Sequence, residues 1–441
     1  ARRACQTVGR LPSGRPTPGP GRAGGARAAQ RRRAWAVLMD YFAVGGRPLL
    51  SGRIYASIFG KNRFRDVEQT QLGAYGDGGP HDLQVPFHSA MGAPGLGDAN
   101  MDEDYDMSPS KTGIRAPMAL HKGFNPEEVS PWDPCRFEEI RKLQDASRNR
   151  GQVFLMRDCV SDRLVAVKKM PTGWVRKCHS DFIIEHPSET EMPWQDVGCI
   201  RFLNSVGYPY GCTLLGVHRD EQSTYVVASF ATEGDLFSWC ETGAAPSSER
   251  EALVQPLARK IFKGVQELHD LSIVHRDLSL ENILLSKTDD DDSLEIRIID
   301  FSMASTARHF RRCVRGKASY QAPELHTDQE YDAYLSDAFS LGVTLYAVLL
   351  KDYPWLSTRP GGCKCFEYVR KHGFRAYLTK RKLRNSNARV GDLMSEPLKQ
   401  LLTGLLALDP DQRLTLGERA WDGTRRSVWD EPWLALGPGR G

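Results

Sequence analysis

The middle of the chain gathers side chains that could hold a divalent cation and move a proton. Asn282 and Asp300 offer hard oxygen ligands, which Mg²⁺ prefers together with waters and phosphate oxygens. Asp277 is a carboxylate that can accept a proton from a hydroxyl, and Lys168 offers a compact positive charge. Together these groups suit chemistry on a phosphate group, which needs positioning and cations more than covalent help from the protein.

These residues lie in segments whose order and spacing resemble those of a eukaryotic protein kinase of the serine/threonine type. The catalytic loop, the metal-binding loop and the end of the activation segment correspond to Val274–Asn282 (VHRDLSLEN), Asp300–Ser302 (DFS) and Ala322–Glu324 (APE). Three further marks follow the family order, namely the strand Val165–Lys168, the central-helix start Asp337–Gly342, and Arg413, which in the family pairs with Glu324. So many ordered matches are hard to obtain by chance.

The resemblance covers about Phe137 to Leu434 and implies an α+β, bilobal protein-kinase-like fold. We expect a small β-rich N-lobe with one main helix over about 137–231, and a larger, mainly helical C-lobe over about 232–434. ATP would lie between the two lobes. Residues 1–125 are expected to be a separate low-complexity, disordered region, since a stretch rich in Arg, Gly and Pro cannot bury a core.

Local patterns agree with this fold. Val153–Met156 and Arg163–Val167 are typical of two strands of one hairpin. The stretch 335–350 is apolar nearly all round, which indicates a buried helix. A second helix is predicted by apolar residues that recur on one face, starts at a capping box of Ser248 and Glu251, and should be kinked or shifted by Pro256. Its apolar face comprises Leu253, Leu257, Ile261, Val265 and Leu268.

Composition narrows the classes of partner. The net charge of +4 over 441 residues is too small to argue for nucleic acid. No run of 18 apolar residues exists, so we expect no transmembrane helix. The ten cysteines show no framework spacing, which favours a reducing compartment such as the cytoplasm. Residues 1–38 carry nine Arg and no acid, a composition also typical of organelle transit peptides, so organelle targeting stays open.

The resemblance gives each candidate residue a role. Asp277 would be the catalytic base, and Asn282 and Asp300 would hold Mg²⁺. Lys168 would contact the α/β-phosphates of ATP, with Lys169 as the alternative register. In the family this Lys needs a carboxylate partner on the N-lobe helix, which here begins near Pro193. Two residues remain candidates for that partner position, Asp196 and Cys199.

The nucleotide-binding positions of the family fall partly on matching residues. They are Gly151, Val153, Ala166, Lys168, Ala228, Phe230, Ala231, Asp235, Leu284 and Asp300. The small Ala228 should leave a deep apolar pocket behind the adenine, and Phe230 and Ala231 would present backbone groups to it. The glycine-rich loop departs from the family, because of its three glycines only Gly151 remains. Arg148 and Arg150 either bind phosphate or face solvent, and we expect weaker nucleotide affinity.

Four further departures bear on activity. The family's Lys after the catalytic Asp is replaced by Ser279, and its Thr before the APE segment by Lys317. Because these positions face each other in the family, we expect a swap in which Lys317 supplies the ammonium and Ser279 the hydroxyl. Ser302 replaces a Gly and should restrict the metal-binding loop. Cys313 stands where an activating phosphate is usually carried near the Arg276 position.

Two functions follow from this set. The first is an ATP- and Mg²⁺-dependent kinase for Ser/Thr hydroxyls of proteins, with a weak preference for basic peptides through Glu281 and Asp235. The second is a pseudokinase that binds nucleotide or partners without catalysis, which the eroded glycine loop favours. The presence of the base and both metal ligands favours the enzyme. The sequence does not identify the oligomeric state.

Overall fold

The computed structural model separates the chain into two units, residues 1–87 and residues 88–441. In the first unit it describes only a short antiparallel pair, β1 (Ala43–Val44) and β2 (Arg47–Pro48). Most of the predicted low-complexity region and Arg148 therefore lie outside the described residues. The residues described in the second unit are 116–117, 119–146, 149–287, 293–383 and 386–435.

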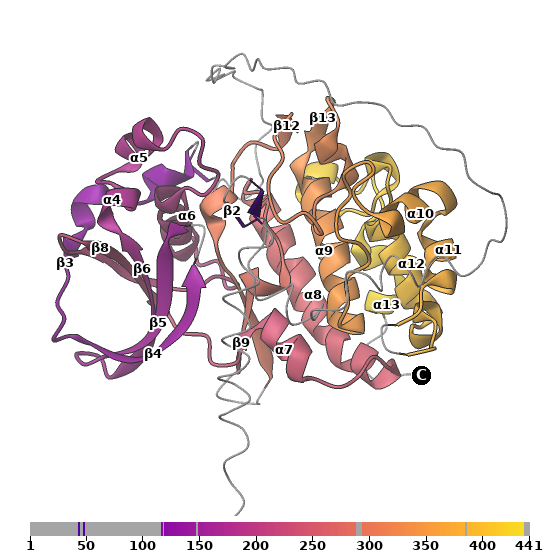
Figure 1. Cartoon of the computed structure of the whole chain (residues 1–441), viewed down its shortest axis with the longest axis horizontal. Helices are drawn as coiled ribbons and strands as arrows, with labels where there is room; N and C mark the ends of the chain where they lie inside the picture. Colours follow the sequence, from indigo (N-terminus) through magenta and orange to yellow (C-terminus); the bar gives the residue numbers. More distant parts are fainter. Residues whose placement is uncertain are drawn as a thin grey trace, which may run out of the picture. The chain divides into compact units, whose positions relative to one another are not determined.

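The N-lobe of the second unit is built on a six-stranded sheet in the order β3-β7-β8-β6-β5-β4 (Figure 1). The predicted hairpin is confirmed as β5 paired antiparallel with β6. Along β6, Val165 and Val167 point into the core while Ala166 and Lys168 lie on the opposite face, as the twofold alternation of a strand requires. The strands are β3 (Ser130–Pro131), β4 (Phe137–Ala146), β5 (Gly151–Asp158), β6 (Arg163–Pro171), β7 (Leu214–Arg219) and β8 (Ser223–Ser229).

The main N-lobe helix is α6 (Pro193–Ser205), which starts at Pro193 as predicted. Proline is favoured in the first turn because its missing N–H has no helical partner there. Two short helices that the sequence analysis did not predict, α4 (Thr172–Val175) and α5 (His179–Glu185), precede it.

A segment before the predicted domain start packs on this lobe. We call residues 120–132 the N-terminal clamp; its first turn (Leu120–Gly123) crosses α6 where Gly123 and Gly198 face each other. Leu120 and Phe124 are buried, and the Phe124 ring lies 6.3 Å from that of Trp194 on α6. The close crossing exists because neither backbone carries a side chain there. The packed N-lobe therefore begins before Phe137.

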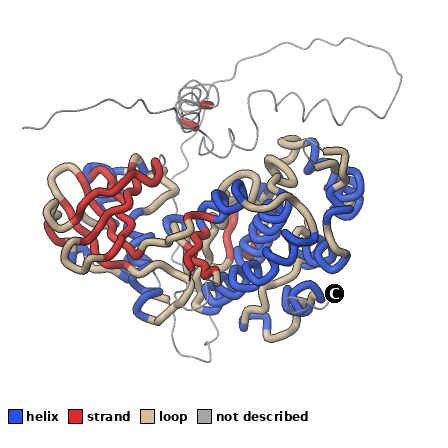
Figure 2. The backbone as a smooth tube through the Cα atoms, turned by 90° about the horizontal axis from the view of Figure 1, so that it is seen from below, coloured by secondary structure: helices blue, strands red, loops and turns tan. Residues whose placement is uncertain are grey.

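The C-lobe is mainly helical, which confirms the α+β, bilobal fold; Figure 2 shows its helices in blue beside the strands in red. Its helices are α7 (Leu236–Thr242), α8 (Ser248–Asp270), α9 (Ala333–Leu350), α10 (Lys364–His372), α11 (Phe374–Lys380), α12 (Glu396–Leu405) and α13 (Pro432–Ala435). Its strands are β9 (Gly234–Asp235), β10 (Ile283–Lys287), β11 (Leu294–Ile298), β12 (His309–Arg311) and β13 (Glu330–Asp332).

Helix α8 differs in detail from its prediction. Its N-cap is Ser247, whose hydroxyl accepts the backbone N–H of Arg250. The predicted capping box of Ser248 and Glu251 is therefore wrong, and the Glu251 carboxylate instead accepts hydrogen bonds from Ser395 and Trp433. Pro256 lies inside a continuous helix. Leu253 is 60% exposed and Val254 is buried, because Leu253 lies at the edge of the apolar face that packs on the lobe.

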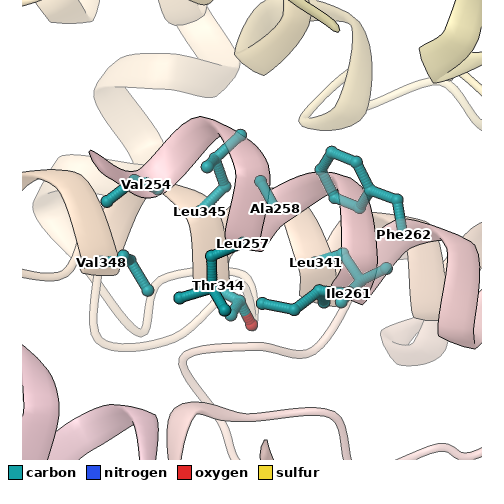
Figure 3. A pocket seen from close by; sticks show the side chains of 9 residues that line it. All are labelled: Val254, Leu257, Ala258, Ile261, Phe262, Leu341, Thr344, Leu345 and Val348. Atoms are coloured by element: carbon teal, nitrogen blue, oxygen red, sulfur yellow. The ribbon is translucent and has the colours of Figure 1, made fainter. Parts of the chain in front are cut away.

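Helix α9 is the buried axis of the C-lobe. All 18 of its residues are buried. By length and hydropathy alone it would be long and apolar enough to cross a membrane, yet its burial in this lobe makes that weak evidence for a span. A small pocket between α8 and α9 has an apolar lining apart from Thr344 (Figure 3), so it is a packing gap away from the polar residues discussed below.

The glycine crossing gives a test of the N-terminal clamp. In an isolated helix, replacing Gly198 by Ala would stabilise by about 1 kcal/mol. Here the new methyl group would collide with the Leu120 carbonyl and lie 2.9 Å from His121 Cα. We therefore expect Gly198→Ala to cost about 1–3 kcal/mol, as overpacking does, measured by urea unfolding of the full chain.

The matched control is Gly173→Ala on α4, because a methyl group at Gly173 has no atom within 4 Å. Its urea midpoint should equal or slightly exceed that of the wild type. A Gly198→Ala chain as stable as this control would contradict the packing of the clamp on α6.

Candidate active site

The loop that carries Asp277 is held by a buried carboxylate on α9. Asp337 accepts the backbone N–H groups of His275, at 2.8 Å, and Arg276, at 2.9 Å. Its side chain is 1% exposed, so these bonds are shielded from water. The predicted position of Asp337 at the start of the central helix therefore explains how the loop is fixed.

A buried histidine supports this anchor from the other side. His269 contacts Asp337 Oδ2 at 3.1 Å through Nε2 and Glu418 Oε1 at 2.7 Å through Nδ1. With a carboxylate at each ring nitrogen, both nitrogens act as donors and the ring is positively charged. Burial lowers the pKa of His269, but the two carboxylates outweigh it and raise the pKa to about 9.

Asp277 is enclosed by groups from two segments. The backbone N–H of Lys317 donates to Asp277 Oδ1 at 3.1 Å. The Asn282 amide donates to the Asp277 carbonyl at 2.7 Å and makes a longer contact, 3.4 Å, with Oδ2. Asp277 is 5% exposed. Three predicted catalytic residues, Asp277, Asn282 and Lys317, thus meet in one small cluster.

The predicted exchange of Ser279 and Lys317 is matched by their contact. Lys317 Nζ donates to Ser279 Oγ at 2.6 Å, and it also contacts Glu281 Oε2 at 2.9 Å. Ser279 is fully buried and Lys317 is 8% exposed. The ammonium therefore lies beside the catalytic loop, although it comes from the activation segment. The sequence did not predict the contact with Glu281, which was expected to attract basic residues of the substrate.

The metal-binding loop lies against this cluster. The backbone N–H of Ile299 donates to the Asn282 carbonyl at 3.0 Å, which brings Asn282 next to Asp300. Asp300 has a left-handed backbone with φ 66°. Ser302 donates its hydroxyl to Asp300 Oδ1 at 2.6 Å. The residue that replaces glycine thus holds the Asp300 carboxylate by a hydrogen bond.

Of the two candidates for the partner of Lys168, the structure selects Asp196. Lys168 Nζ lies 3.3 Å from Asp196 Oδ2. Cys199 is a fully buried thiol, and burial raises its pKa well above the usual range. The alternative register is also excluded, since Lys169 Nζ lies over the Tyr225 ring at 5.6 Å. Asp is shorter than Glu, but α6 sits close enough for the pair to form.

The same carboxylate also reaches the metal-binding loop. Asp196 Oδ1 accepts the backbone N–H of Phe301 at 2.9 Å. The N-terminal end of α6 makes two further contacts there. The N–H of the N-cap residue Met192 donates to the Ser302 carbonyl at 3.1 Å, and the Gln195 amide donates to the Ala304 carbonyl. One helix end therefore fixes Lys168 and the residues after Asp300 together.

Lys168 is held as an ammonium. Burial lowers its pKa, but the charges of Asp196, Asp300 and Glu191 together outweigh burial and raise the pKa above its usual value. The side chain therefore keeps its positive charge although it is largely buried, as a contact with phosphate oxygens would require.

The remaining nucleotide positions fall into two groups. Ala166 and Ala228 pair directly across β6 and β8, and Val153 pairs with Lys168 across β5 and β6. Leu284 pairs with Asp235 across β10 and β9 in the C-lobe. Phe230 and Ala231 follow β8 and lead toward β9. Val153, Ala166, Lys168 and Ala228 therefore lie on the N-lobe sheet, Asp235 and Leu284 lie on the C-lobe sheet, and Phe230 and Ala231 lie in the segment between the two sheets.

Two of the predicted nucleotide-binding residues, Gly151 and Asp235, also have structural roles. Gly151 is packed tightly, since a methyl group there would meet Asn149 Oδ1 and the Lys169 carbonyl, each at 2.8 Å. Arg150 is exposed with φ 54°. Asp235 caps α7 by accepting the Ser238 N–H at 2.6 Å. In the glycine loop, Gly151 is therefore required by packing, and Arg150 faces solvent.

The activation segment is ordered by contacts to Arg276. Its guanidinium donates to Cys313 Sγ at 2.9 Å and lies 3.9 Å from the centre of the Phe310 ring. Cys313 thus occupies the place beside Arg276 that was predicted from the sequence. Farther along, Arg413 forms the predicted ion pair with Glu324, with Nη2 to Oε2 at 2.9 Å.

The donor set fits Mg²⁺ bound together with phosphates. Asn282 and Asp300 supply an amide and a carboxylate oxygen, both hard ligands. Among the described residues no group of three or more His, Cys, Asp or Glu side chains is arranged to hold a metal ion. A magnesium ion at Asn282 and Asp300 would therefore complete its shell with phosphate oxygens and water.

Comparisons with known proteins agree with this geometry. A family model described as "Protein kinase domain" matches residues 148–433. The serine/threonine-protein kinase SAPK3 of Oryza sativa subsp. indica is 30% identical over 291 residues, or 64% of this chain and 75% of the rice protein.

With two further relatives, the match spans a smaller share of the relative's length. The probable serine/threonine-protein kinase fhkD of Dictyostelium discoideum is 30% identical over 240 residues, 52% of this chain and 30% of that protein. Protein kinase kin1 of Schizosaccharomyces pombe is 28% identical over 229 residues, 52% of this chain and 22% of that protein.

The buried His269 predicts a pH dependence of stability. Its pKa rises from 6.5 to about 9 on folding, so its stabilisation is fully present below pH 6.5 and is lost as the pH rises through 9. The full shift corresponds to about 3 kcal/mol. We expect the difference in unfolding free energy between the wild type and His269→Gln to shrink by about this amount between pH 6.5 and pH 9.5. Parallel pH curves would show that His269 is neutral in the folded protein.

Proposed function

Because this chain belongs to the protein kinase family, we propose that it transfers the γ-phosphate of ATP to Ser or Thr hydroxyls of protein substrates. The observation that carries the proposal is the enclosed cluster of Asp277, Asn282 and Lys317 beside the metal-binding loop. A protein kept only for binding would have no need to bury the Asp277 carboxylate against the Asn282 amide and the Lys317 N–H, with the Lys317 ammonium bound to the same loop. The cytoplasmic location predicted from the cysteines is part of this proposal.

In the proposed reaction Asp277 orients the substrate hydroxyl and accepts its proton as the oxygen bonds to the γ-phosphorus and the bond to the β-phosphate oxygen breaks. The Lys317 N–H holds one oxygen of the Asp277 carboxylate, so the carboxylate has a fixed direction. This orientation places the incoming hydroxyl in line, which is a large part of what catalysis requires here.

The two lysines would balance the phosphate charge. Lys168, held by Asp196, would contact the α/β-phosphates, and Lys317 would contact the γ-phosphate from the activation segment. Asn282 and Asp300 would hold Mg²⁺, which when bound neutralises charge on the phosphate oxygens. Ser302 would keep the Asp300 carboxylate turned toward that position.

A pseudokinase that binds nucleotide or partner proteins is the second candidate. The observation that favours it is the glycine loop, where Gly151 is tightly packed and Arg150 is exposed. Such a loop cannot bring its backbone N–H groups close to phosphates as easily as three glycines would. We rank it second because weaker loop contacts lower nucleotide affinity, whereas the base and the metal ligands remain.

The test is γ-phosphate transfer by the full chain with ATP and Mg²⁺ to mixed Ser/Thr peptides. We expect transfer by the wild type and a loss of at least about 100-fold in Asp277→Asn, because the amide cannot accept the proton. Nucleotide binding by thermal shift should be equal in both proteins. Binding without transfer by the wild type would favour the pseudokinase, and equal transfer by the two proteins would contradict the role of Asp277.

A further inference from the structure

The Lys317 ammonium has an acidic partner inside the active site. Glu281, in the turn Leu280–Asn282, contacts it with Oε2 at 2.9 Å, and the Glu281 and Lys317 side chains are 19% and 9% exposed. A buried ammonium is costly without a paired carboxylate, and losing one partner of a buried pair typically costs several kcal/mol. The pair is therefore a requirement for placing a lysine at this point of the activation segment.

The second oxygen of Glu281 is also turned inward. Glu281 Oε1 is buried and has no hydrogen-bond partner among the described residues. Nearby lie two buried phenols, Tyr320 and Tyr353, joined by a hydrogen bond of 2.8 Å between their hydroxyls. Burial, together with the charge of Glu281, raises the pKa of both phenols. This carboxylate belongs to the interior of the site and is not laid out as an exposed acid.

We propose that Glu281 is a positioning residue for Lys317 and is not an anchor for basic residues of the substrate. The inference rests on the proposed function and deepens it. An arginine of a substrate would have to compete with an ammonium that is already 2.9 Å away and buried. If the arginine won, the largely buried Lys317 ammonium would lose the carboxylate that compensates its charge. Glu281 therefore directs the ammonium toward the γ-phosphate and Ser279.

The other acid predicted to attract basic peptides is also engaged. Asp235 Oδ1 accepts the Ser238 N–H at 2.6 Å and caps α7. With both acids in use within the chain, the weak preference for basic peptides predicted from the sequence loses its basis. The expected substrate class is Ser/Thr peptides chosen without regard to basic flanking residues.

The experiment is a double-mutant cycle of Glu281→Gln and Lys317→Met in the full chain, assayed with two peptides that differ only in Arg or Ala near the acceptor Ser. Glu281→Gln should lower kcat for both peptides by the same factor, up to about 100-fold, since misplacement of a catalytic group by about 1 Å can cost that much. The peptide KM values and their ratio should not change. In the Lys317→Met background the same change should have little further effect.

Controls separate positioning from folding. Glu281→Asp keeps the charge and should recover part of the lost kcat, whereas a structural role would make the shorter side chain no better than Gln. Lys371→Met on α10 removes an exposed lysine outside the site and should leave kcat unchanged. The same four proteins should also be compared by urea unfolding. Because the two side chains are in contact, the effects of the two substitutions on the unfolding free energy should not be additive.

Three outcomes would overturn the inference. A loss in Glu281→Gln confined to the Arg peptide, with a raised KM, would make Glu281 a substrate anchor. Equal losses in the presence and absence of Lys317 would mean that Glu281 acts independently of the ammonium. Wild-type protein that transfers phosphate to neither peptide would refute the proposed function and the inference together, which distinguishes that failure from the first two.

Discussion

One buried carboxylate connects the parts of this molecule that must act together. Asp196 binds the Lys168 ammonium with one oxygen and the Phe301 N–H with the other. Its position depends on α6, which is packed against the N-terminal clamp at the Gly123–Gly198 crossing. A strand, a helix and the metal-binding loop therefore share a single charge, and moving the helix would separate the lysine from the loop.

On the C-lobe side of the site, too, a lysine depends on a carboxylate of the same chain. Lys317 replaces a lysine that the family carries two residues after the catalytic Asp, and it brings its charge from a different segment. That relocation works because Ser279 is small enough to leave space and Glu281 compensates the ammonium. Asp337 on α9 binds the backbone of the catalytic loop, and His269 on α8 contacts Asp337. The His269 ring and the Lys317 ammonium thus each have a carboxylate partner within the chain.

The hairpin and the central helix were predictable from local patterns, namely strand alternation and an apolar stretch. The two lobes and the meeting of Ser279 with Lys317 were predicted from the resemblance to protein kinases, because they join segments far apart in the sequence. The sequence left Asp196 and Cys199 open because a count along the chain cannot fix the start of a helix relative to a strand. The N-terminal clamp was missed because Leu120 and Phe124 show no periodicity. The contact of Glu281 with Lys317 was missed because pairing of a carboxylate with a lysine from another segment depends on tertiary structure.

The most direct test of this account is the rate of γ-phosphate transfer by Asp196→Asn compared with Cys199→Ser. Both substitutions lie on α6 and nearly conserve volume, but only the first removes the charge shared by Lys168 and the metal-binding loop. The account predicts a loss of about 100-fold or more in kcat for Asp196→Asn and a near-normal rate for Cys199→Ser. Equal rates for Asp196→Asn and the wild type would contradict it.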